Sequence, residues 1–187
     1  MSKYKVNIGD IELISLTDGQ GSGEATEIFP TSDLDIWQSE YRDLLDGTVI
    51  HPRFGSFVIS LNGRLIVVDT GMNGPDGKLL DDMNAKGVDR NQIEIVINTH
   101  LHPDHVGWNL SNGKPTFPNA RYLVPKHDWD YWTGPEVIND APWVTDSVLP
   151  LNEERILDLI DGEYDITSEI KAVPTPGHTP GHISISI

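Results

Sequence analysis

The chain has 187 residues, which is long enough for one domain with a substantial core and too short for two large ones. Its 13 basic and 29 acidic residues give a formal net charge of −16, and this excludes a binder of duplex nucleic acid, because affinity for phosphates depends on clustered Lys and Arg. Cysteine is absent, so disulfides, thiolate ligands and a cysteine nucleophile are excluded, and any metal must be held by imidazole or carboxylate.

The start of the chain, residues 1–7, lacks the long apolar stretch of a secretory signal. No run approaches the roughly 20 apolar residues that span a bilayer. We therefore expect a cytoplasmic protein without a membrane partner.

The first elements are a hairpin, a loop and a helix. Alternation over 11–16, between Gly-Asp and Asp-Gly pairs, predicts that this run is the half-buried second strand of the hairpin. Residues 20–32 are rich in Gly, Ser, Thr and Pro and predict a loop. Apolar residues at helical spacing between Leu34 and Leu45 predict a helix that packs one face inward.

A second hairpin has the strongest local signal in the chain. Two β-rich runs, 55–61 and 64–69, flank the turn pair Asn62-Gly63. A helix is expected over 77–85, ended by Gly87, and it leads to the apolar strand 93–98.

The second half alternates shorter elements. We expect a strand at 121–124, a short helix from about Lys126, and strands at 155–160 and 169–174. The last run, 181–187, alternates like a strand with one buried face.

Histidines concentrate in two short stretches. Of the seven in the chain, three are His100, His102 and His105, and two more are His178 and His182. A lone histidine is most simply explained as a loop residue or as a hydrogen-bonded core residue. Five in two clusters predict shared ligation of metal ions instead.

The spacing in the first cluster suits ligation. His100 and His102 are separated by one residue, so on an extended segment they project to the same side and can share one cation. Pro103 fixes its own φ and biases His102 away from helix, and Asp104 follows past the turn. The ligands can therefore diverge towards two metals. Imidazole and carboxylate suit zinc and related divalent ions, and loops at strand ends leave coordination positions open for catalysis.

These segments resemble a known family. Thr-His-Leu-His-Pro-Asp-His at 99–105 resembles the HxHxDH signature of the metallo-β-lactamase superfamily, 175–182 resembles its second ligand segment, and 67–71 resembles its strand-end motif. Within the superfamily, 104–109 and 117–120 look like the branch of N-acyl homoserine lactonases and organophosphate (methyl parathion) hydrolases. The fold that this resemblance implies is α/β (α+β), a four-layer αββα sandwich.

The resemblance also implies the ligand set. His100, His102 and His178 would bind the first metal, and Asp104 and His105 would contribute to the second. Two zinc ions per complete domain are expected, with iron and manganese as alternatives. Asp104 would also be catalytic, because it would help to hold the attacking hydroxide.

Four further residues are weaker candidates. His182 is expected to pack or hydrogen-bond beside the ligands. Asp69 is expected to orient a ligand imidazole, with a role in the turn before Thr70-Gly71 as the alternative. Trp108 and Asn109 follow the ligand loop and would line a substrate pocket, although Trp108 could equally belong to the core.

Other aromatic and histidine residues are given ordinary roles. The aromatic group at 129–143 is expected in the core, with a pocket rim or a dimer surface as the alternatives. His51 and His127 are isolated, and we expect neither to bind a metal.

The function expected from these residues is that of a hydrolase in which metal-bound hydroxide cleaves an ester, a lactone or a related bond of a small molecule. Two alternatives stay open: a mono-iron persulfide dioxygenase of the same superfamily, and a non-catalytic metal-binding fragment.

The resemblance places a bridging Asp and a further His beyond the second histidine motif, and residues 183–187 contain neither. We therefore expect 1–187 to be a single metallo-β-lactamase-like domain that is incomplete at its C-terminus. It would contain the N-terminal half of the sandwich and the start of the second half. Exposed strand edges would then favour association, for which a homodimer is the open candidate.

Overall fold

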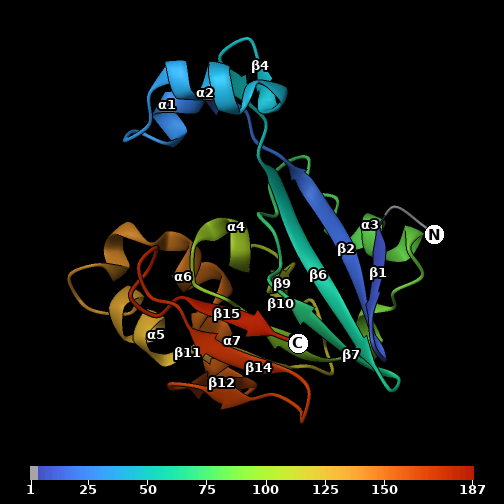
Figure 1. Ribbon diagram of the computed structural model, residues 1–187. Coiled ribbons are helices and arrows are strands. Elements are labelled where there is room, and N and C mark those ends of the chain that lie inside the picture. Colours follow the sequence, from blue (N-terminus) through green and yellow to red (C-terminus); the bar gives the residue numbers. More distant parts are fainter. Residues whose placement is uncertain (1–3) are drawn as a thin grey trace.

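The computed structural model describes residues 4–187 as a mixed α/β structure built on one seven-stranded sheet (Figure 1). The strands lie in the order β1-β2-β6-β7-β8-β11-β12. The first four strands in this order, β1, β2, β6 and β7, are antiparallel to their neighbours in this group, whereas β7, β8, β11 and β12 run parallel to one another. Their bounds are β1 (Lys5–Ile8), β2 (Ile11–Gln20), β6 (Arg53–Leu61), β7 (Arg64–Val68), β8 (Ile93–Ile97), β11 (Arg121–Pro125) and β12 (Leu157–Ile160).

The hairpin of β6 and β7 follows from its turn residues. Asn62 and Gly63 both have positive φ, 51° and 83°, which is what a two-residue turn between right-handed twisted strands requires. The turn pairs Leu61 with Arg64 and sets the register of both strands. The predicted hairpin is confirmed.

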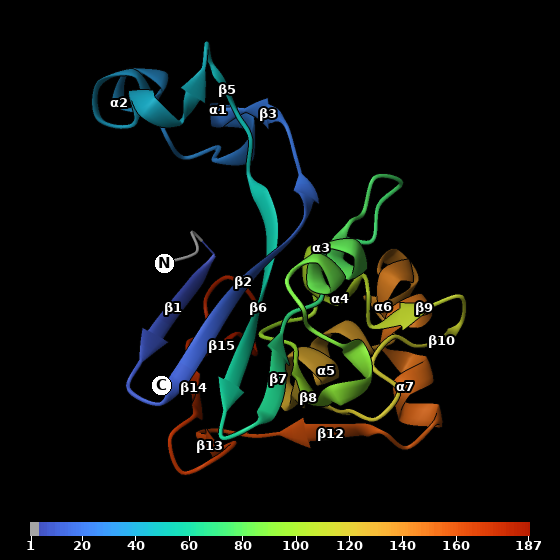
Figure 2. The same ribbon diagram turned by 90° about the vertical axis from the view of Figure 1, so that its right-hand side faces the viewer.

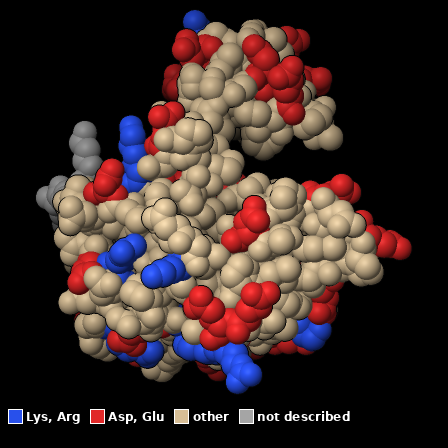
Figure 3. Space-filling view, turned by 180° about the vertical axis from the view of Figure 1, so that it is seen from behind, with Lys and Arg blue, Asp and Glu red and all other residues tan. Residues whose placement is uncertain are grey.

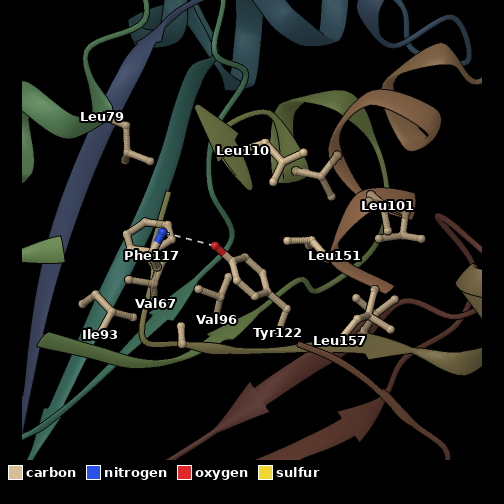
Figure 4. Packing of buried hydrophobic residues seen from close by; sticks show 14 of the residues in the cluster. Val67, Leu79, Ile93, Val96, Leu101, Leu110, Phe117, Tyr122, Leu151 and Leu157 are labelled. Atoms are coloured by element: carbon tan, nitrogen blue, oxygen red, sulfur yellow. Dashed lines mark hydrogen bonds between the residues drawn. The ribbon is translucent and has the colours of Figure 1, made fainter. Parts of the chain in front are cut away.

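Helices cover one face of this sheet (Figure 2). Alternate residues of the parallel strands, among them Val67, Val96 and Tyr122, point into a core that they share with the helices (Figure 4). The helices are α3 (Leu79–Ala85), α4 (Pro103–Val106), α5 (Lys126–Trp132), α6 (Pro142–Ser147) and α7 (Leu149–Glu153), with short 3-10 helices at Arg90–Gln92 and Ile138–Asp140. A small ribbon pairs β9 (Leu110–Ser111) with β10 (Lys114–Pro115).

A second, three-stranded sheet covers the other face. It consists of β13 (Tyr164–Asp165), β14 (Lys171–Pro174) and β15 (Ile183–Ser186), all antiparallel. Ile66, Ile97 and Leu123 point away from the helices and pack in a second core with Ile170 and Ile183. The layer order is therefore helix, sheet, sheet.

Residues 23–50 form an arm that stands away from these layers and joins them through a narrow neck (Figure 3). Two predictions are wrong here. The expected loop at 20–32 contains a strand and a helical turn, and the helix expected over 34–45 ends at residue 40 with no residue buried. The arm comprises β3 (Gly23–Glu24), α1 (Ala25–Ile28), α2 (Leu34–Glu40), a 3-10 helix (Arg42–Leu44), β4 (Leu45–Asp46) and β5 (Val49–Ile50).

The parallel strands bring the loops that carry the site to one edge of the sheet. Their carboxyl ends meet at one edge of the sheet, where ligand-binding loops of α/β proteins collect. The segments that leave this edge include 69–78 after β7, 98–106 after β8, and α5 directly after β11. In the part of the chain described, no helix is long and apolar enough to cross a membrane.

Candidate metal centre

Three histidines converge at this edge. His100 and His102 follow β8, and His178 comes from the loop between β14 and β15. Their ligand nitrogens all lie within 4.8 Å of one another, and His102 Nδ1 is 3.0 Å from His178 Nε2. His100 is only 2% exposed, whereas His178 is open to solvent. Two distant segments therefore make one site with a buried and an open side.

The hydrogen bonds of His100 leave one ring nitrogen free. The Thr99 hydroxyl donates its proton to Asp69 Oδ2 at 2.8 Å, so it can only accept from His100 Nδ1, which is 3.0 Å away. This arrangement puts the ring proton on Nδ1 and leaves the lone pair on Nε2. Nε2 is buried and has no hydrogen-bond partner among residues 4–187.

Electrostatics also keep these rings neutral. Burial lowers the pKa of His100, and the neighbouring His105 and His102 lower it further, to about 2. The pKa of His102 is lowered as well, by burial and by His178. Since only a neutral imidazole can bind a metal, both rings are in the ligating form near neutral pH.

A second group adjoins the first. His105 lies between two carboxylates, with Nδ1 2.8 Å from Asp69 Oδ2 and Nε2 3.4 Å from Asp104 Oδ2. The His105 ring centroid is 3.8 Å from that of His100. The two groups therefore form one continuous cluster.

The carboxylates set the charge of His105. Burial would lower its pKa, but hydrogen bonds with Asp104 and Asp69 outweigh burial and raise the pKa to about 10. Burial would raise the pKa of Asp104, yet the hydrogen bond with His105 lowers it. The raised pKa favours the protonated form of His105, in which each ring N–H faces a carboxylate.

Asp69 lies between the two groups and bonds to residues of both segments. Its carboxylate accepts hydrogen bonds from the Thr99 backbone N–H at 2.7 Å, from the Thr99 hydroxyl and from His105 Nδ1. Asp69 has a positive φ of 58°, a strained conformation for a residue with a side chain. Asp69 thus contacts His105 directly and reaches His100 through the Thr99 hydroxyl.

The residues that follow the ligand loop point inward. Asn109 is fully buried, where its side chain bonds those of Thr70 and Asn98, so it supports the loop from below. Trp108 packs partly against the core and donates from Nε1 to Asp18 Oδ1 at 2.7 Å.

The later aromatic group lies both in the core and beside the site. Trp129, Trp132 and Trp143 pack against the helix-side core. The Trp132 ring also contacts His102 edge-on, with ring centroids 5.4 Å apart. The Trp132 ring therefore gives the site an apolar neighbour beside His102.

The remaining histidines lie in different places. His182 lies beside the cluster, with its ring centroid 5.1 Å from that of His100 and its Nδ1 2.9 Å from Thr175 Oγ1. His51 and His127 lie outside it, each near one exposed carboxylate.

Two buried acids beside the site belong to no motif in the sequence. Asp128, at the start of α5, accepts hydrogen bonds from backbone N–H groups of both ligand-bearing segments. Asp18, at the end of β2, accepts four backbone N–H bonds from 72–79 as well as the Trp108 bond. In the sequence, the one indication of their role is that each follows shortly after a predicted strand, 11–16 for Asp18 and 121–124 for Asp128.

The donor set fits divalent metal ions. It consists of imidazole and carboxylate, the ligands that zinc accepts when cysteine is absent. The buried Nε2 of His100 has no hydrogen-bond partner among residues 4–187, and a bound cation would satisfy its lone pair. The three-histidine group and the Asp104–His105 pair would hold one ion each.

Comparison with known proteins identifies the family. The family model of the metallo-beta-lactamase superfamily matches residues 56–187, a range that contains Asp69, the three-histidine group and the Asp104–His105 pair. The chain belongs to the metallo-β-lactamase superfamily.

Individual relatives in the superfamily are distant. An N-acyl homoserine lactonase of Bacillus thuringiensis is 26% identical over 167 residues, which are 77% of this chain and 62% of that protein. The N-acyl homoserine lactonase AttM of Rhizobium radiobacter is 29% identical over 116 residues, covering 60% of this chain and 42% of that one. This chain therefore spans less than two thirds of the curated relatives it matches.

Solved structures confirm the predicted fold class. AidC, a dizinc quorum-quenching lactonase in complex with a product, has a TM-score of 0.83 at 24% identity, covering 98% of this chain and 69% of that one. The hydrolase AbOPH of the beta-lactamase superfamily also has a TM-score of 0.83, at 23% identity, covering 97% of this chain and 68% of that one.

Proposed function

We propose that this chain forms the metal-binding part of a dizinc hydrolase that cleaves an ester or a lactone. The observation that carries the proposal is the convergence of three histidines, from two segments, around a buried His100 Nε2 that has no hydrogen-bond partner among residues 4–187. The Asp104–His105 pair beside them supports a second ion.

When bound, two divalent ions activate water near neutral pH and polarise the bond to be cleaved. The residues of the chain have distinct tasks. His100, His102 and His178 hold the first ion, and Asp104 and His105 help to hold the second. The side chain of Asp104 is 36% exposed, so its carboxylate can also accept a hydrogen bond from the attacking water and orient it.

The substrate class rests on similarity. The curated relatives are named N-acyl homoserine lactonases, and AidC is described with N-hexanoyl-L-homoserine as product. The apolar ring of Trp132 beside His102 supports a substrate with an apolar group. We therefore favour a lactone or ester with an acyl chain.

The test is elemental analysis of the purified chain combined with hydrolysis of an N-acyl homoserine lactone, an aryl ester and a phosphotriester. We expect zinc in the wild type and its loss from the first site in His102→Ala. The exposed, isolated His51 supplies the control, because His51→Ala should keep the wild-type zinc content.

Equal zinc in His102→Ala and the wild type would contradict the proposal. So would a chain that contains iron and consumes oxygen with a persulfide but cleaves no ester or lactone.

A further inference from the structure

The helix α5 contributes a buried carboxylate that touches both ligand-bearing segments. Asp128 is 0% exposed. Its Oδ2 accepts the Leu101 N–H at 2.9 Å, and its Oδ1 accepts the Gly181 N–H at 2.6 Å. Leu101 stands between His100 and His102, and Gly181 stands between His178 and His182. One side chain thus joins the two halves of the three-histidine group.

We propose that Asp128 is a positioning residue for the first metal, because its carboxylate fixes the segments that carry His100, His102 and His178 at their ligating separation. This inference rests on the proposed function. Asp128 does not ligate. It acts on the backbone that aims the ligands.

The surroundings of Leu101 show how tightly this point is fixed. Its N–H is bound by Asp128, its carbonyl accepts Trp143 Nε1 at 2.7 Å, and its side chain is fully buried. His100 and His102 are the chain neighbours of this anchored residue, and their ligand nitrogens lie within 4.8 Å of each other. A shift of the Leu101 peptide would therefore move both ligands.

The surroundings of Gly181 are equally close. A Cβ built on Gly181 would lie 2.2 Å from the backbone nitrogen of Asp128, a distance that only glycine permits. A backbone hydrogen bond from Ile183 N to Thr99 O at 3.0 Å joins the same segments a little further along. The contact with α5 sets how near the His178 loop can approach the other two ligands.

The hydrogen bonds of Asp128 require a carboxylate rather than an amide at this position. Both of its partners are N–H donors, and a carboxylate can accept from both. An amide in its place would accept one bond and turn its own NH₂ group towards the other N–H. Asp128→Asn should therefore release one of the two segments while keeping the size of the side chain.

The experiment measures zinc affinity by competition with a chromophoric chelator, and backbone amide exchange in the metal-free protein. For Asp128→Asn we expect zinc affinity at the three-histidine site to fall about 10- to 100-fold, as for other residues that orient metal ligands. The amide of Leu101 or Gly181 should exchange faster than in the wild type.

Two further variants separate positioning from general destabilisation. Gly181→Ala keeps Asp128 but forces the His178 loop away from α5, so it should weaken zinc binding as well. Asp18→Asn replaces another buried carboxylate that accepts backbone N–H groups, yet its partners lie in 72–79 and at Trp108. It should lower thermal stability and keep the wild-type zinc affinity at the three-histidine site.

The outcomes are distinguishable. If the wild type binds zinc and Asp128→Asn binds it equally well, or if Asp18→Asn weakens binding as much, the inference is overturned and the proposed function stands. If the wild type binds no zinc, the proposed function fails and the inference fails with it.

Discussion

At the scale of single residues, His105 links the chemistry of the site to the stability of the fold. In the metal-free chain its imidazolium lies between Asp69 and Asp104, and these carboxylates raise its pKa from 6.5 to about 10 against the effect of burial. A histidine with a raised pKa in the folded state adds stability that is fully present below its unfolded pKa of 6.5. That stability is lost as the pH rises through about 10.

We therefore expect the free energy of unfolding of the metal-free chain to fall between pH 6.5 and pH 10. Asp69→Asn should make this fall shallower, because the amide cannot stabilise the imidazolium as the carboxylate does. Urea unfolding in the presence of a chelator, at several pH values in this window, measures the slope. The control is Asp161→Asn, which removes the carboxylate from the exposed His127 pair and should leave the slope unchanged. An identical slope in Asp69→Asn and the wild type would contradict the assignment.

The sequence reveals some of these residues and hides others for a physical reason. Histidines at 100, 102 and 105 are conspicuous because closely spaced imidazoles are typical of metal binding and uncommon in ordinary loops. Asp128 bonds backbone N–H groups 27 and 53 residues away, and backbone groups leave no trace in residue types. Only the fold shows that its carboxylate reaches both ligand segments.

At the scale of elements, the segments that leave β7 and β8 are bound to each other by their backbones. Thr70 N–H donates to His105 O, and Gly107 N–H donates to Gly71 O, both at 2.8 Å. A Cβ built on Gly107 would lie 2.3 Å from the backbone of Met72. This close approach keeps Asp69 within reach of His105.

Gly107→Ala should separate these segments. We expect a loss of about 1 to 3 kcal/mol in stability from overpacking. We also expect weaker binding of the second ion, measured as zinc bound per chain in a titration. Gly87→Ala is the matched control, since Gly87 has a positive φ of 75° but no atom within 4 Å of the added Cβ. It should cost about 1 to 2 kcal/mol through backbone strain alone and leave the zinc stoichiometry unchanged. Unaltered zinc binding in Gly107→Ala would show that the contact does not support the second site.

The sequence predicts correctly the elements that pack between neighbouring layers, and it predicts the arm wrongly. The strand expected at 93–98 became β8, whose alternate faces pack in two cores. The helix expected over 34–45 has the same kind of apolar pattern, yet Tyr41 and Leu44 remain 51% and 62% exposed. Periodicity shows which residues share a face, and it does not show whether another layer covers that face.

At the scale of the whole molecule, the arm behaves as an addition to the layered body. Its strand β5 pairs with β3 and β4, and its aromatic rings contact one another at tilted angles. The ring centroid of Trp37 is 5.5 Å from that of Phe29 and 5.4 Å from that of Tyr41. Below it, β2 and β6 are already paired, since Gln20 lies opposite Arg53. The body therefore contains its own cores and the whole candidate site.

Replacing residues 23–50 by an Asn-Gly turn should leave the body folded, because the turn closes two strands that are already adjacent. Zinc content and the far-ultraviolet spectrum of the body should be retained.

The arm carries seven acidic residues and one arginine, and its acidic surface is visible in Figure 3. The full chain has a net charge of −16, so added salt should stabilise it by screening the repulsion between like charges. The shortened chain carries less negative charge, so the same salt should raise its stability by a smaller amount. Thermal unfolding at low and high salt measures this difference. If the shortened chain loses its zinc or fails to unfold cooperatively, the arm is part of the fold that holds the metals, and the exposed face of α2 would then need a partner in the body.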